Sequence, residues 1–520
     1  MIFASIGHCL RLARAGYVMA REGVFANVDA SLVPPAARLP LALARLIARR
    51  NASGLASAMA RLGPSYVKLG QFLATRADII GPAAVQQLEM LQDRMAPFAR
   101  EAAVAQIEAS FGKKISEIFV EFGEPVAAAS VAQVHRARVA DADGTREVAV
   151  KVIRPGVERR FRRDLSDMYF AARLAERFSS QSKRLKPVEV VDVLARSVKM
   201  EMDFRLEAAA ASEFAENNRD ETFFRVPSID WDRTAKDVLT LEWIEGAPLS
   251  DRAALEKTGR DLPALGRSII EVFLKHAVRD GFFHADMHQG NLFVDTAGRL
   301  VAVDFGIMGR LGLKERRFLA EILFGFITRD YMRVARVHFA AGYVPASHSV
   351  EDFAQAIRAV GEPIHSRTAD QISMARVLTL LFEITGLFDM KTRTELVMLQ
   401  KTMVVVEGVA RALDPRLDIW AAAEPVIGEW IAGNLGPLGK LQDAGRGLAA
   451  LVDAALQLPE AVARTQAMAD RLEAAVAEGF ALSPAAIEAI GKAEARRARW
   501  GNAALWVIAA AAVWAVWRGS

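Results

Sequence analysis

The sequence contains very little cysteine: Cys9 is the one cysteine among 520 residues. This excludes a disulfide framework, a zinc ribbon and a cysteine-ligated iron–sulfur cluster. The chain also lacks a dinucleotide-binding glycine fingerprint, a haem-ligating cysteine context and a metal-ligand cluster, so an oxidoreductase is not expected. No basic stretch precedes an apolar core at the N-terminus, and we expect no secretory signal there. A composition of 52% hydrophobic and 25% charged residues excludes a disordered chain.

Positive charge is concentrated at the two ends of the chain. Residues 1–50 hold seven arginines against Glu22 and Asp29, and residues 491–520 hold five basic residues against Glu494. The whole chain has a net charge of only +4, so the body between the ends is acidic. An acidic body argues against nucleic acid as a partner. Basic ends suit anionic membrane lipids, at which each basic residue contributes about 1 kcal/mol. The alternative is that these residues are solubilising charges.

The last residues form the longest apolar run. Ala503 to Trp517 is uncharged, and Trp500 lies three residues before it. A helix from Trp500 to Trp517 would be about 27 Å long, which suits a thin bilayer core, with a tryptophan at each interface. This predicts a transmembrane helix over 500–518; the alternative is a helix packed on the body or on a partner. Three arginines precede the run and place the body on the cytoplasmic side of a bacterial inner membrane: Arg496, Arg497 and Arg499.

A cluster of polar residues between positions 284 and 306 predicts phosphoryl transfer. Residues 284–291 are His-Ala-Asp-Met-His-Gln-Gly-Asn, and Asp304-Phe-Gly follows thirteen residues after Asn291. Phosphoryl transfer requires a carboxylate near the nucleophile and oxygen ligands for Mg²⁺. Asp286 supplies the first, as the catalytic residue, and Asn291 and Asp304 supply the second. The offsets of five residues from Asp286 to Asn291 and of thirteen residues from Asn291 to Asp304 match those of the catalytic loop and the Asp-Phe-Gly motif in protein kinases.

A lysine that holds the nucleotide phosphates is expected upstream, on a strand. Val148-Ala-Val-Lys151 resembles the kinase Val-Ala-Ile-Lys strand and predicts that Lys151 binds nucleotide. Its acidic partner should lie on a long helix predicted over 186–217, where Glu201 and Glu207 are both candidates. Glu242, at the end of a strand predicted over 238–242, is a further nucleotide-binding candidate.

Other features depart from ordinary protein kinases. Short strands are predicted at 118–120 and 131–139, before Lys151. No Gly-x-Gly-x-x-Gly motif occurs in this part of the sequence. His288 occupies the usual place of a catalytic-loop lysine, and no Ala-Pro-Glu follows Asp304. An alanine-rich stretch replaces the glycine-rich loop and supplies the other nucleotide-binding candidates: Val126, Ala127, Ala128, Ala129, Ser130, Val131, Ala132, Gln133 and Val134.

Together these features resemble the UbiB family of atypical kinases, also called aarF-domain or ADCK kinases. Lys68-Leu-Gly-Gln71 matches the family's KxGQ motif, and Glu201-Met-Asp203 matches its ExD motif. The resemblance covers roughly residues 55–420. It implies that the KxGQ helix folds over the active site, that Lys68 faces Glu201, and that Glu207 pairs with Lys151. It assigns Lys68, Gln71, Glu201, Asp203 and Glu207 to structural or regulatory pairing.

We therefore predict an α+β, kinase-like, two-lobed fold that binds ATP and Mg²⁺ and supports ubiquinone biosynthesis at the membrane. Quinone-precursor lipids and proteins of that pathway are the further partners expected. Alternatives are a small-molecule phosphotransferase and a non-catalytic, nucleotide-binding scaffold. The predicted regions, in chain order, are a basic amphipathic region (1–60), the KxGQ extension (61–116), an N-lobe with inserted helices (117–245), a helical C-lobe (246–435), a helical region (436–499) and the transmembrane helix (500–518).

Overall fold

An antiparallel sheet of four strands forms the core of the N-lobe in the computed structural model. The described residues are 2–26, 35–49, 54–74, 95–141, 144–178, 186–257, 259–364, 386–390 and 394–435, with single positions at 80, 84, 87, 88, 91 and 384. The sheet has the order β1 (Glu121–Ala128), β2 (Ala132–Asp141), β3 (Gly144–Ile153) and β5 (Val238–Glu242). The predicted strand at 118–120 is wrong, because Ile118 ends the short helix α8 (Ile115–Ile118) and β1 begins at Glu121.

Alternation along β3 sets which side chains reach the site. Val148, Val150 and Val152 are fully buried and pack with Ala103 and Ile107 of α7 (Arg100–Phe111). Lys151 therefore points to the opposite face of the sheet, since successive side chains of a strand alternate.

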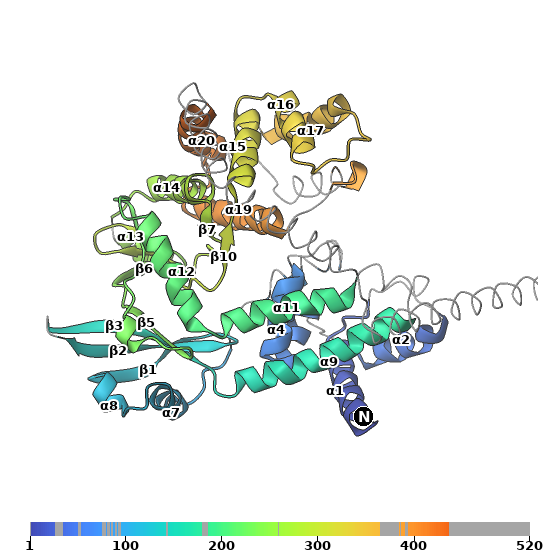
Figure 1. Cartoon of the computed structure of the whole chain (residues 1–520), viewed down its shortest axis with the longest axis vertical. Helices are drawn as coiled ribbons and strands as arrows, with labels where there is room; N and C mark the ends of the chain where they lie inside the picture. The colour runs from blue at the N-terminus through green and yellow to red at the C-terminus, as the bar shows by residue number, and fades with distance from the viewer. Residues whose placement is uncertain are drawn as a thin grey trace, which may run out of the picture. The chain divides into compact units, whose positions relative to one another are not determined.

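Two long helices run beside each other from this sheet. α9 (Val157–Phe178) packs along α11 (Pro187–Glu201), and α4 (Pro64–Ala74) lies against both (Figure 1). α12 (Phe204–Asn217) follows α11 after a break. The prediction of one helix over 186–217 is therefore wrong. Asp203 has extended backbone angles, and its side chain accepts a hydrogen bond from the Arg205 amide, which makes it the N-cap of a new helix.

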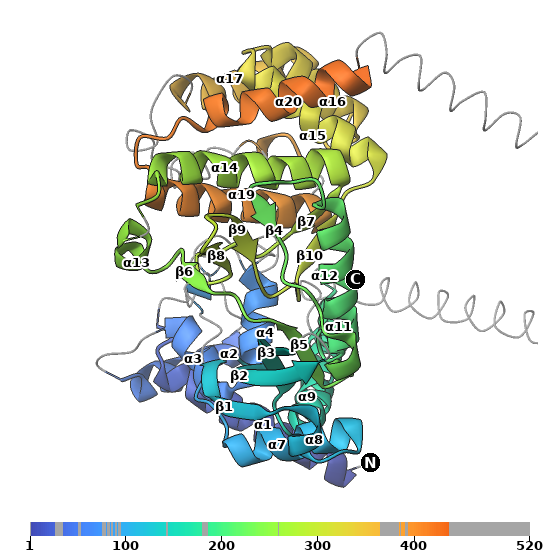
Figure 2. The same cartoon turned by 90° about the vertical axis from the view of Figure 1, so that its left-hand side faces the viewer.

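The C-lobe combines small sheets with stacked helices. One sheet has the order β4 (Phe224–Arg225), β9 (Leu300–Ala302), β8 (Leu292–Asp295) and β6 (Gly246–Pro248); β7 (Phe282–His284) pairs with β10 (Met308–Arg310). α14 (Leu262–Leu274) and α19 (Thr394–Leu413) cover these strands (Figure 2). Further helices among the described residues of the lobe are α13 (Arg252–Lys257), α15 (Leu313–Ile327), α16 (Tyr331–Ala340), α17 (Val350–Ile364) and α20 (Ile419–Leu435).

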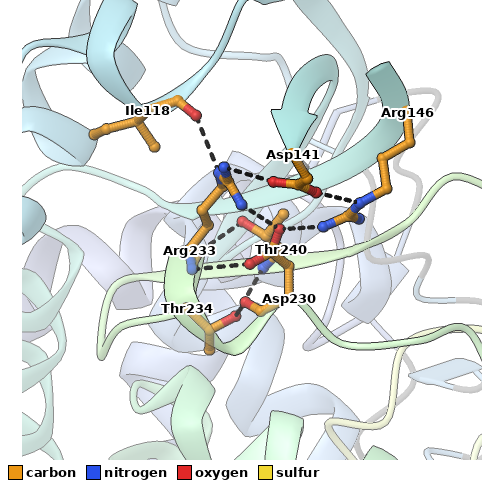
Figure 3. A network of polar contacts seen from close by, with 7 residues as sticks. All are labelled: Ile118, Asp141, Arg146, Asp230, Arg233, Thr234 and Thr240. Atoms are coloured by element: carbon orange, nitrogen blue, oxygen red, sulfur yellow. Dashed lines mark hydrogen bonds and ion pairs between the residues drawn. The ribbon is translucent and has the colours of Figure 1, made fainter. Parts of the chain in front are cut away.

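A closed ring of four charged side chains lies at the end of the N-lobe sheet where β2 turns into β3 (Figure 3). Arg146 bonds Asp141 at 2.8 Å and Asp230 at 2.6 Å, and Arg233 bonds the same two carboxylates at 3.0 and 2.9 Å. The Nε atom of Arg233 also donates to the Ile118 carbonyl. The ring ties the β2–β3 hairpin to the turn before β5.

The described residues before the sheet also form α1 (Ile2–Arg21), α2 (Pro35–Ile47) and α3 (Gly54–Leu62). Among the described helices, none is both long enough and apolar enough to cross a membrane. The predicted helical region 436–499 and the predicted transmembrane helix 500–518 lie outside the described residues.

Candidate active site

Lys151 bonds two acidic side chains, those of Glu207 and Asp304. Its Nζ atom lies 2.8 and 3.0 Å from the two carboxylate oxygens of Glu207 on α12, and 3.0 Å from Oδ1 of Asp304. Of the two acids considered for pairing with Lys151, Glu207 therefore takes that place. Since β3, α12 and the segment after β9 each supply one of these residues, the site forms only when the two lobes are assembled.

The ionisation of this triad follows from its burial and its pairing. Burial raises the pKa of Glu207 to about 7. The positive charge of Lys151 lowers this pKa, and the negative charge of Asp304 raises it, but burial is the largest effect. Burial also opposes ionisation of Asp304, but Lys151 lowers the pKa of this carboxyl well below its usual value, and Lys68 adds to the effect. Burial opposes the charge of Lys151 too, yet its two carboxylate neighbours raise the pKa of the amine. Asp304 is thus held as an anion, which suits a metal ligand.

The backbone of Asp304 has a conformation that non-glycine residues rarely adopt. Its φ angle is 64°, in the left-handed region. Strain of this kind costs on the order of 1–3 kcal/mol and is concentrated at functional sites. The Gly306 amide donates to Oδ1 of Asp304 at 3.3 Å, and Lys151 holds the same oxygen. These contacts fix the direction of the carboxylate.

The catalytic loop between β7 and β8 places Asp286 and Asn291 next to each other. The Nδ2 atom of Asn291 donates to the Asp286 carbonyl at 3.1 Å, which leaves Oδ1 available as an oxygen ligand. The Val303 amide donates to the Asn291 carbonyl at 2.8 Å and ties the loop to the residue before Asp304. The carboxylate of Asp286 is partly exposed, as a group that receives a proton from a substrate must be. Asn291 and Asp304 thus fit the oxygen-donor set that Mg²⁺ prefers.

His284 is a buried scaffold residue of the same loop. Its Nδ1 atom accepts from the Asp286 amide at 3.1 Å, and its Nε2 atom donates to the Val303 carbonyl at 3.3 Å. These bonds require the neutral ring, and burial lowers the pKa of His284 accordingly. His288 lies on the exposed side, where Nδ1 accepts from the Gly290 amide and Nε2 lies 3.7 Å from Oδ2 of Asp286.

The KxGQ helix, α4, brings a second lysine to the site. Lys68 is nearly buried and forms an ion pair with Glu201, the last residue of α11. Gly70 of the same motif faces Leu91, and a Cβ atom there would lie 2.7 Å from Cδ2 of that leucine. Gln71 lies three residues after Lys68 on the same helix and is half-buried. Asp203 of the ExD motif caps α12 and pairs with Arg205 at 2.7 Å, so its position is structural.

The alanine-rich stretch forms the β1–β2 hairpin and is tied to the segment that precedes α7. The Met95 amide donates to the Ala128 carbonyl, and Arg154 Nη2 donates to the carbonyls of Ala96 and Ala129. Gln133 is buried, and its side chain exchanges hydrogen bonds with the backbone of Phe98. Of the nucleotide-binding candidates here, Val126 and Ala127 are exposed, whereas the side chains of four others face protein: Ser130, Val131, Ala132 and Gln133.

The side chain of Glu242, a nucleotide-binding candidate, is bonded by groups of the protein. Arg225 Nη1 lies 2.9 and 3.0 Å from its two oxygens, and Arg225 Nε bonds Asp295 at 2.8 Å. The Ser228 amide donates to it as well. Glu242 therefore links β5 of the N-lobe to β8 of the C-lobe, and its side chain is engaged by protein where a nucleotide contact was predicted.

Thr402 is a residue of the site that motif reasoning missed. It is buried on α19, and its hydroxyl group lies 3.0 Å from the carbonyl oxygen of Ala285, the residue before Asp286. It also reaches the Met398 carbonyl one turn earlier, at 2.8 Å. A single threonine on an apolar helix gives no local signal in the sequence; only its position opposite the catalytic loop identifies it.

Comparisons with known proteins agree with this geometry. Residues 90–338 match the ABC1 atypical kinase-like domain, and residues 357–418 match the UbiB helical domain. A probable protein kinase UbiB from Marinobacter nauticus is 42% identical over 410 residues, which are 78% of this chain and 74% of that protein. The chain belongs to the UbiB family. A second UbiB, from Pseudomonas putida, is 42% identical over 385 residues, covering 73% of this chain and 71% of that protein.

A solved structure shares the fold of this UbiB chain. It is the Rv3197–erythromycin complex from Mycobacterium tuberculosis, with 25% identity and a TM-score of 0.50, covering 75% of this chain and 97% of that one. The predicted kinase-like α+β fold is confirmed. The UbiB helical domain contains the whole of α19 and thus Thr402, so this family-specific domain contacts the catalytic loop directly.

Proposed function

We propose that this UbiB protein binds Mg²⁺–ATP between Lys151 and Asp304 and transfers or hydrolyses its terminal phosphoryl group in support of ubiquinone biosynthesis at the bacterial inner membrane. The observation that carries the proposal is the Lys151 triad, in which one buried amine bonds Glu207 and Asp304 from separate lobes. Such an amine can bind two phosphate groups when a nucleotide replaces Asp304 as its partner. The family name and the names of the relatives support the same pathway and chemistry.

Each residue of the site has one task in this proposal. Mg²⁺ would neutralise the charge on the phosphates, and Asn291 and Asp304 would hold it. The attacking oxygen of water or of a hydroxyl group would form a bond to the terminal phosphorus, while the bond from that phosphorus to the bridging oxygen breaks and ADP leaves. Asp286 would accept the proton of the attacking group. His284 keeps the loop in place through its two backbone hydrogen bonds.

The KxGQ helix favours a small or membrane-held acceptor over a protein. Lys68 and Glu201 form their ion pair close enough to Asp304 for Lys68 to lower the pKa of that carboxyl. A peptide chain that approached Asp286 would have to compete with this helix. We therefore expect little phosphorylation of peptides.

ATP turnover by the purified full chain tests the proposal, with an Asp286→Asn variant as the comparison. We expect Mg²⁺-dependent turnover that falls by about 100-fold or more in the variant, while nucleotide affinity changes little, because a general base contributes roughly 10²–10⁴-fold. A phosphorylated small molecule among the products would identify a small-molecule phosphotransferase. Nucleotide binding without turnover would instead support a scaffold.

A further inference from the structure

The first helix of the chain, α1, has polar residues on the side that faces the protein. His8 and Arg11 both bond the buried carboxylate of Asp167 on α9, with Arg11 Nε and Nη2 at 2.6 and 2.7 Å. The His8 ring stacks on Phe170 at 5.1 Å between centroids. Ala15 is buried one turn further along. Charge and hydrogen bonding thus attach α1 to the body, together with buried apolar residues.

The opposite side of α1 is apolar and exposed. Ile6, Leu10 and Tyr17 are 50, 68 and 50% exposed. At 100° per residue they share one face with Ala13, on the far side of the helix from His8, Arg11 and Ala15. An amphipathic helix of a soluble body normally buries its apolar face. Here the apolar face is turned away from the protein.

The neighbouring helix, α2, adds a second exposed apolar face. Leu43, Leu46 and Ile47 are exposed, with Leu46 at 81%, whereas Leu41 is buried. The two helices are held together at one end, where the Arg49 amide donates to the Arg21 carbonyl.

The charge on this pair of helices has one sign. α1 and α2 contain no acidic residue, and their charged residues are Arg11, Arg14, Arg21, Arg38 and Arg45. Glu22, directly after α1, is buried against Arg61. Arg14, Arg38 and Arg45 are exposed. An apolar face with arginines and without carboxylates complements an anionic lipid surface, which offers both hydrocarbon and negative charge.

We propose that the outward faces of α1 and α2 are a lipid-docking surface, which lies in the headgroup region of an anionic bilayer with Ile6, Leu10, Tyr17 and Leu46 directed toward the acyl chains. The residues of this surface are different from those of the kinase-like site. It goes beyond the proposed ATP-dependent function and does not require it.

Cys9 provides a direct test, because it is the one cysteine of the chain and is exposed, next to Leu10. The full chain is labelled at Cys9 with an environment-sensitive fluorophore and mixed with vesicles that carry a nitroxide quencher near the headgroups. With phosphatidylglycerol in the vesicles, we expect a blue shift and strong quenching. With phosphatidylcholine alone, both changes should be weak.

Substitutions then locate the effect. Leu10→Glu should remove most of the quenching, whereas Leu313→Glu, at a leucine on α15 with the same 68% exposure, should leave it unchanged. The proposal is overturned if the label stays in water on anionic vesicles to which the protein binds. It is also overturned if the label is already in apolar surroundings without vesicles, since another segment or a second copy would then cover the face. Loss of ATP turnover with intact quenching would contradict the proposed function and not the docking surface.

Discussion

Lys151 and Asp304 lie 153 residues apart in the sequence, and their side chains meet at 3.0 Å. This contact joins the two lobes at the point where a nucleotide is proposed to bind. Glu207 completes it from a third element and holds the lysine with both carboxylate oxygens.

The raised pKa of Glu207 predicts a pH dependence of stability. Its value of about 7 in the folded protein exceeds the usual 4.5, so the folded state binds the proton more tightly than the unfolded chain. The stabilisation is full below about pH 4.5 and is lost as the pH rises through 7, by up to about 3 kcal/mol. As the pH is raised from 5 to 8, the thermal midpoint of the wild type should therefore decrease relative to that of Glu207→Gln. A constant difference between the two proteins would show that Glu207 does not titrate in this range.

Breaking the Lys68–Glu201 pair should change activity more than folding. Lys68→Ala leaves the partly buried carboxylate of Glu201 without its partner. An unpaired carboxylate in such a place lowers the free energy of unfolding by about a few kcal/mol, unless it protonates or moves into solvent. We expect α4 to loosen, with altered ATP turnover and loss of support for the quinone pathway in cells. Adding Glu201→Gln should restore the thermal midpoint, because no unmatched charge remains. A Lys68→Ala protein with wild-type turnover and full complementation would make Lys68 an ordinary solvated lysine.

Thr402 should position the catalytic loop without touching the substrate. Thr402→Val keeps the shape of the side chain and removes the hydroxyl group that reaches the Ala285 carbonyl. Loss of one such bond to a buried carbonyl costs about 1–3 kcal/mol, and misplacement of Asp286 should lower kcat while nucleotide affinity stays the same. Thr402→Ser should retain the wild-type kcat. Equal effects of the two substitutions would assign Thr402 to packing alone.

The charge ring of the N-lobe should contribute to stability and not to chemistry. Asp230→Asn removes the buried carboxylate that Arg146 and Arg233 share, and we expect a loss of about 2–4 kcal/mol. Asp232→Asn, two residues away and exposed, should have almost no effect. Denaturation of both variants measures the difference. Similar stability of the two would mean that the ring is held by Asp141 alone.

The main chemistry of the site could be predicted from the sequence because its residues lie in short motifs. Asp286, Asn291 and Asp304 have fixed offsets along one loop and the following strand, and Lys151 lies on a strand with clear alternation. The pairing of Lys68 with Glu201 was predicted only through the family resemblance. Composition and spacing alone carry no information on which helix folds over which.

Other features depended on contacts between distant segments. Apolar periodicity continues through Asp203, so the end of α11 is decided by a capping hydrogen bond that the pattern does not reveal. Glu242 is engaged by Arg225, which comes from another strand and also bonds Asp295 in the C-lobe. Thr402 lies 117 residues from its partner, on a helix with no motif of its own.

Binding of Mg²⁺–ADP to Asp304→Asn tests the central claim most directly. The substitution removes the anionic metal ligand and keeps the size of the side chain. We predict that Mg²⁺–ADP raises the thermal midpoint of the wild type, that EDTA abolishes the shift, and that Asp304→Asn shows little or none of it. An unchanged Mg²⁺–ADP shift in Asp304→Asn would contradict the assignment of the site.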